Sequence, residues 1–93
     1  MTEEATNYEV LSDEARVNVT WAGQNGDMAQ PVSVDASDAD IRMWVTEAVS
    51  AGSVQGIAAD ENADFSDFVV DRFAPSEGRP FALFSIRPKT PFG

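Results

Sequence analysis

The stretch from Asp60 to Asp71, DENADFSDFVVD, comes closest of any segment to a metal-binding motif. Positions 1, 3, 5, 7 and 12 of a calcium-loop register are filled by Asp60, Asn62, Asp64, Ser66 and Asp71. However, the sixth position is Phe65 where the loop needs a glycine for its sharp turn, and the last is a short Asp in place of a bidentate Glu. The sequence therefore predicts a solvated acidic loop and no bound metal.

Side chains suited to catalysis are scarce in this chain. It has no histidine and no cysteine, so the commonest general base, the best nucleophile, disulfides and thiolate zinc sites are all missing. No spacing typical of a nucleophile elbow or a phosphate-binding loop occurs. The acidic cluster of Asp35, Asp38 and Asp40 is explained by helix capping and solubility. We therefore expect no enzyme activity, no catalytic residues and no cofactor.

The charge balance narrows the class of partner. Sixteen Asp and Glu residues stand against six Lys and Arg, for a net charge of -10 and a pI near 4.1. Such a field repels phosphate backbones and anionic lipids, so we expect no direct binding to nucleic acid or membranes. Three explanations of the acidity stay open: solubility alone, a basic protein partner (including mimicry of DNA by an inhibitor), and adaptation to high salt. The charge does not indicate an oligomeric state.

The 93 residues suffice for one domain with a modest core. The N-terminal segment is acidic where a secretory signal is basic and then apolar, and no apolar run approaches the about 20 residues of a membrane span. We therefore expect a soluble cytoplasmic protein. Residues 1–14 are predicted to form a flexible acidic arm, residues 15–88 the folded domain, and residues 89–93 an extended C-terminal tail.

Hydrophobic periodicity in the first third predicts a β-hairpin. Val17, Val19 and Trp21 alternate with polar residues, which is the period of a half-buried strand. The residues QPVSVD alternate again after a short gap. Between them, Asn25-Gly26 suits the positive φ angles of a tight hairpin turn.

The period changes to that of a helix over residues 38–51. Ser37 is a suitable N-cap, and Gly52 supplies the left-handed residue that ends a helix. Apolar residues recur at spacings of three and four, which predicts one amphipathic helix with its stripe in the core. The stripe consists of Ile41, Trp44, Val45, Ala48 and Val49.

After the helix comes a long, irregular acidic connection with Val54 and Ile57 as its expected anchors. The runs FVVDRF and RPFALFSIRP then predict two strands around the turn APSEGR. Because the last strand is apolar on both faces, we expect it at the centre of the sheet, parallel to the first. The predicted fold is α+β, with element order ββαββ, a four-stranded mixed sheet of order 2-1-4-3, and one helix packed on one face.

This arrangement resembles the β-grasp fold of ubiquitin-like proteins. The resemblance covers about residues 15–93 and rests on the hairpin RVNVTWAGQNGDMAQPVSVD, the capped helix SDADIRMWVTEAV, the long link, the final strand and a tail that ends in glycine. It implies a domain that works by protein–protein contact and, in some members, by activation of the C-terminal carboxylate. Gly93 matches that reactive end, whereas Phe92 stands in place of the first glycine of the usual pair.

Two surfaces are candidates for contact with a partner protein. In the tail, Pro88 and Pro91 favour an extended chain, Phe92 is the natural anchor, and Gly93 allows close approach, which favours recognition of the tail over chemistry on it. On the sheet the candidates include Val69, Ala82, Phe84 and Ile86; the alternative is that Phe84 and Ile86 are core and that Phe81 and Leu83 form the exposed apolar set. Two other functions stay open: an acidic inhibitor or DNA mimic of a basic protein, and a structural component of a viral particle.

Overall fold

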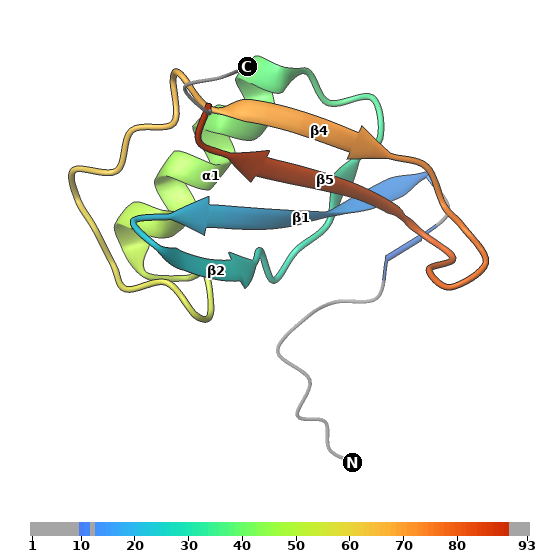
Figure 1. The fold of residues 1–93 in the computed structure, drawn as a ribbon, viewed down its shortest axis with the longest axis horizontal. Coiled ribbons are helices and arrows are strands. Elements are labelled where there is room, and N and C mark those ends of the chain that lie inside the picture. Colours follow the sequence, from blue (N-terminus) through green and yellow to red (C-terminus); the bar gives the residue numbers. More distant parts are fainter. Residues whose placement is uncertain (1–9, 12, 90–93) are drawn as a thin grey trace, which may run out of the picture.

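The computed structural model describes residues 10–11 and 13–89 and shows an α+β fold with one helix on one mixed sheet (Figure 1). This confirms the predicted fold class. The sheet has five strands in place of the predicted four, because one strand forms over Gln24–Asp27, at the predicted turn, and the predicted strand QPVSVD contributes only Val32–Ser33. The elements in chain order are β1 (Glu14–Trp21), β2 (Gln24–Asp27), β3 (Val32–Ser33), α1 (Asp38–Ala51), β4 (Val69–Phe73) and β5 (Ala82–Arg87).

The strands follow the order β2-β1-β5-β4. β1 also pairs with β3, so it has both β2 and β3 as antiparallel partners. β1 and β5 are parallel, in a register that runs from Ala15 opposite Ala82 to Val19 opposite Ile86. The pairs β1–β2, β1–β3 and β4–β5 are antiparallel. β5 therefore has a strand on each side, while α1 lies behind the sheet in the view of Figure 1.

The hairpin between β1 and β2 turns three residues earlier than its sequence predicts. Its two loop residues are Ala22 and Gly23, with φ of 52° and 78°, and the predicted turn residues Asn25 and Gly26 lie inside β2. Positive φ at both central residues is what the type I′ turn of a two-residue hairpin requires. The prediction of an Asn25-Gly26 turn is therefore wrong. In β2, the Asn25 side chain forms hydrogen bonds with β1, and Gly26 packs closely against the backbone of Gln55.

The strand predicted over QPVSVD is shorter than expected. The amide of Met28 still donates to the carbonyl of Val17 at 2.8 Å, but pairing with β1 resumes only where Val32 lies opposite Ala15. Pro31, which has no amide hydrogen, lies in the gap. The chain is thereby separated from the sheet between β2 and β3, next to α1.

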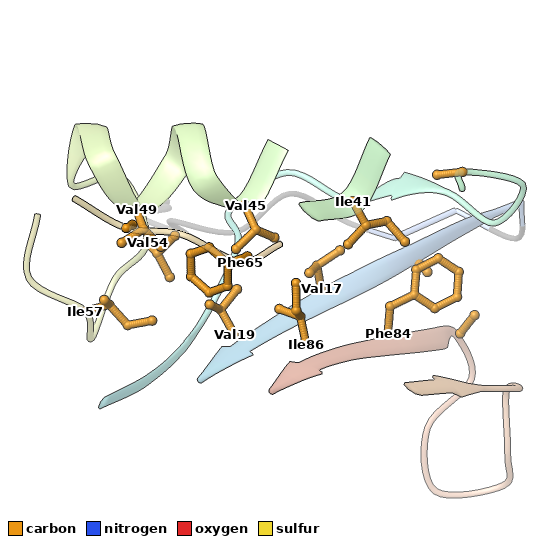
Figure 2. Close-up of a cluster of buried hydrophobic side chains, with 14 residues drawn as sticks. Val17, Val19, Ile41, Val45, Val49, Val54, Ile57, Phe65, Phe84 and Ile86 are labelled. Carbon is orange, nitrogen blue, oxygen red and sulfur yellow. The ribbon is translucent and has the colours of Figure 1, made fainter. Parts of the chain in front are cut away.

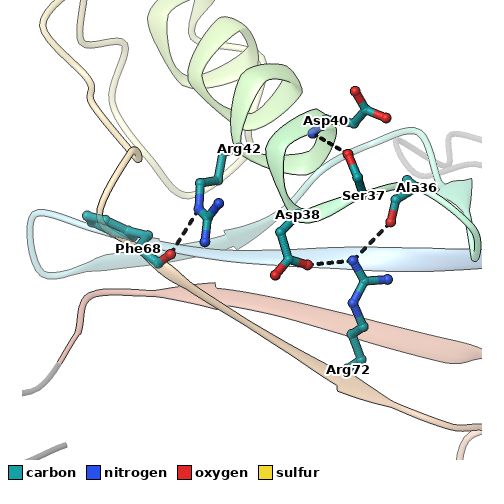
Figure 3. A network of polar contacts seen from close by, with 7 residues as sticks. All are labelled: Ala36, Ser37, Asp38, Asp40, Arg42, Phe68 and Arg72. Carbon is teal, nitrogen blue, oxygen red and sulfur yellow. Dashed lines mark hydrogen bonds and ion pairs between the residues drawn. The ribbon is translucent and has the colours of Figure 1, made fainter.

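The predicted helix and its caps are confirmed. The hydroxyl of Ser37 accepts a hydrogen bond from the amide of Asp40 at 3.0 Å, and Gly52 ends the helix with φ 74°. Figure 3 shows how β4 holds the start of this helix: Arg72 donates to the carbonyl of Ala36 at 2.9 Å and pairs with Asp38. These contacts fix α1 across the sheet face that carries the core.

The core lies between α1 and one face of the sheet (Figure 2). Of the predicted core residues, the fully enclosed ones come from β1, α1 and β5; the others, namely Trp21, Val34, Trp44 and Ala48, are only partly buried at its margin. The connection between α1 and β4 closes one end of the core with Val54, Ile57 and Phe65. The buried predicted residues are Val17, Val19, Ile41, Val45, Val49 and Phe84.

Candidate binding surfaces

The sheet face that α1 leaves uncovered carries a mainly apolar cluster, in which Phe73 is exposed and the other members are partly buried. Phe73 of β4 lies opposite Leu83 of β5, and Leu83 lies opposite Arg16 of β1, so the three residues form one row across the sheet. The guanidinium of Arg16 lies 5.8 Å from the ring centroid of Phe81. We call Arg16, Phe73, Phe81 and Leu83 the open-face cluster.

The sheet pleat explains why these side chains are outside. Residues alternate between the two faces of a strand, and Ala82, Phe84 and Ile86 point toward the helix. Leu83 therefore points away from it, as does Phe73, its partner across the β4–β5 pair. Phe73 remains 47% exposed, one of the most exposed large apolar side chains in the described part of the chain.

Polar contacts border the open-face cluster on the same sheet face. Arg87 donates to the carboxylate of Asp71 at 2.7 Å, and the amide of Asn18 donates to Asp27 at 2.8 Å. Asn25 adds hydrogen bonds to Asn18 and Thr20. An exposed apolar patch with a polar rim is typical of a surface that binds another protein.

The residues that the sequence assigns to binding fall in other places. Phe84 and Ile86 are 4% and 0% exposed and point into the core, so neither is available to a partner, and the prediction of a docking patch at these two residues is wrong. Phe92 and Gly93 lie outside the described residues. The alternative pair, Phe81 and Leu83, lies on the uncovered face, as sheet parity requires.

Sequence reasoning did not assign Arg16 to binding, and it missed the most exposed member of the open-face cluster, Phe73. It is the last residue of the predicted strand FVVDRF, where a terminal aromatic is readily assigned to the core. The signal that identifies its side is the strand register: Val70 packs against the core and Arg72 reaches the helix, so the odd-numbered residues of β4 face outward.

A second surface is a groove of about 670 Å³ beside the helix. One wall is the segment between β2 and β3, where the chain separates from β1, and the other is the flank of α1 that carries Trp44, Glu47 and Ala48. We call it the α1 groove. Its lining includes Met28, Pro31, Val32, Trp44, Glu47 and Ala48.

In the acidic segment with calcium-loop spacing, the carboxylates of Asp60 and Asp64 accept hydrogen bonds from other groups of the protein. Asp60 accepts hydrogen bonds from the Asn62 amide and from the Trp21 indole, both at 2.9 Å. Hydrogen bonds from the Ser66 amide and hydroxyl hold the pKa of Asp64 below its usual value. In the described ranges, 10–11 and 13–89, no three acidic or histidine residues are grouped in a way that suits a metal ion.

We expect calorimetric titration with calcium at moderate salt to give no saturable heat at micromolar concentrations, because binding would have to break these internal hydrogen bonds. A single-site isotherm that Asp60→Ala abolishes would contradict this expectation. Asp67→Ala, a change at an acid outside the register, serves as the matched control.

Comparison with protein families, with characterised proteins and with solved structures finds no match to this chain. Within residues 10–11 and 13–89, no helix has the length and apolar character needed to cross a membrane. The case for function therefore depends on the two surfaces themselves.

Proposed function

We propose that this protein is a non-enzymatic protein–protein interaction module with a ubiquitin-like β-grasp fold, and that its partner docks on the open-face cluster. The fold assignment is supported by the strand order, by the parallel β1–β5 pair at the centre of the sheet, and by the single helix that packs on one face. The ubiquitin-like resemblance implies work by contact with proteins, and the uncovered sheet face offers the surface for it.

The observation that carries the proposal is the exposure of Phe73 beside Phe81, Leu83 and Arg16. Aromatic and arginine side chains contribute most of the binding energy at many protein interfaces, particularly when a polar rim surrounds them. A partner that inserts an apolar side chain between Phe73 and Leu83 would bury their exposed area. Burial of about 100 Å² of apolar surface contributes about 2.5 kcal/mol before ordering costs.

The acidic-inhibitor alternative depends on a different observation. The connection between α1 and β4 exposes several carboxylates, among them Glu61, Asp64 and Asp67. An inhibitor that acts through this loop would bind a basic protein with strong salt dependence. Docking on the open-face cluster depends chiefly on apolar burial and is therefore much less sensitive to salt.

The test is comparative affinity capture from an extract of the source organism, with two matched variants. Phe73→Glu places a charge in the open-face cluster, whereas Met43→Glu places the same charge on the outer side of α1, where Met43 is 50% exposed. We expect a protein that wild type and Met43→Glu retain and Phe73→Glu loses, by at least about tenfold in recovered amount.

A protein that all three forms retain equally would contradict docking on the open-face cluster. A protein that is lost equally from all three in raised salt would favour the acidic-inhibitor alternative. A fourth form without residues 89–93 tests the tail, whose removal we expect to weaken capture of the same partner.

A further inference from the structure

The α1 groove has one charged residue among the described residues that line it, and that residue is an acid. Glu47 is exposed on α1, three positions after Trp44, so the two side chains are neighbours on the helix surface. The remaining lining residues are apolar or neutral. The groove therefore combines an indole ring, a carboxylate and apolar walls.

These three features suit the side chain of an arginine or lysine. A cation is attracted to the face of an indole ring, a carboxylate forms a charge-assisted hydrogen bond with it, and apolar walls cover the aliphatic stem. An acidic side chain would be repelled by the like charge of Glu47. A purely apolar side chain would remove water from the Glu47 carboxylate without giving it a partner, which is unfavourable.

The size of the groove indicates an extended segment in place of a single side chain. Its volume of about 670 Å³ lies in the range of about 300–1,000 Å³ of pockets that enclose most of a drug-sized ligand. The opposite wall runs from Met28 to Ser33; its two ends are hydrogen-bonded to β1, whereas residues 29–31 have left that strand. Residues on either side of the cation therefore have room to lie along Pro31 and Val32.

We propose that the α1 groove binds a basic, extended segment of a protein partner, with an arginine or lysine side chain held between Trp44 and Glu47. The net charge of -10 adds long-range attraction for such a segment. The proposal is independent of the open-face cluster, because the groove lies beside β2 and β3, at the sheet edge opposite β4.

The test is isothermal titration calorimetry with an octapeptide of alternating arginine and valine. The matched variants are Glu47→Lys, in the groove, and Glu61→Lys, on the exposed connection; each changes the net charge equally. We expect saturable binding to wild type, a loss of about tenfold or more in affinity for Glu47→Lys, and a change of less than about threefold for Glu61→Lys. Trp44→Leu should also weaken binding several-fold.

An equal loss of affinity in Glu47→Lys and Glu61→Lys would overturn the proposal, because the change in net charge alone would then explain the loss. It would also be overturned by an octapeptide of alternating glutamine and valine that binds as tightly as the arginine peptide. Absence of saturation by the arginine peptide below about 1 mM would do the same. Thermal unfolding of each variant is the control for retention of the fold. Because Glu47 and Glu61 are both exposed, we expect little change in Tm for either lysine variant.

Discussion

Replacement of Phe65 by alanine is expected to lower the free energy of unfolding by about 3–5 kcal/mol. Phe65 is fully buried, and its ring lies 4.8 Å from the ring of Trp21 and 4.7 Å from that of Phe68. Truncation would leave a cavity at the end of the core and remove the contacts that hold the irregular connection on the sheet. A domain of this size has a stability of about 5–15 kcal/mol, so the loss is a large share of the total.

Urea denaturation followed by circular dichroism measures this loss. Phe73→Ala is the control of the same residue type: because Phe73 is about half exposed, its removal should cost no more than about 1.5 kcal/mol. A cost below about 1 kcal/mol for Phe65→Ala would mean that the connection between α1 and β4 is not part of the core.

The second large effect is expected at Gly26. A Cβ at this position would lie 2.0 Å from the carbonyl oxygen of Gln55 and 3.1 Å from its carbonyl carbon. Because both atoms are backbone, no side-chain rotation relieves the clash, and either β2 or the segment around Gln55 must move. We expect Gly26→Ala to destabilise the protein by about 2–4 kcal/mol, which corresponds to a fall of about 10 °C or more in Tm.

Gly78→Ala is the matched control, since a Cβ there meets nothing within 4 Å and the residue has no positive φ. Its Tm should stay within a few degrees of wild type. If Gly26→Ala melts at the same temperature as Gly78→Ala, the close contact between β2 and the Gln55 segment is absent in solution.

Local signals explain what the sequence could predict. The limits of α1 follow from a capping hydroxyl at Ser37, a left-handed glycine at Gly52 and an apolar stripe of period 3.6. All three signals come from residues of the helix itself or next to it. The alternation from Val17 to Trp21 similarly depends on nearest neighbours. Such features need no knowledge of the tertiary fold.

The misplaced hairpin turn shows where a local signal is misleading. Asn25-Gly26 has the residue types of a tight turn, but Gly26 is small because the backbone of Gln55, 29 positions later, packs against it. Asn25 has a separate role, since its amide donates to Asn18 and Thr20 across the hairpin. Neither contact can be inferred from the dipeptide alone.

The binding surfaces were the least predictable part. The last strand is apolar on both faces, so its sequence does not say which of Phe84 and Leu83 faces the helix; the parallel register with β1 decides it. The α1 groove arises from the gap in pairing between β2 and β3, which alternation in QPVSVD conceals. Long-range pairing, and not composition, determines both surfaces.

The proposed partner protein covers the sheet face that α1 leaves open. Hydroxyl-radical labelling with mass spectrometry tests it most directly, applied to the protein alone and in complex with the captured partner. We expect labelling of Phe73, Phe81 and Leu83 to fall on complex formation, while labelling of Met43, an exposed residue of α1, stays unchanged. Protection of Met43 with no change at Phe73 would contradict it.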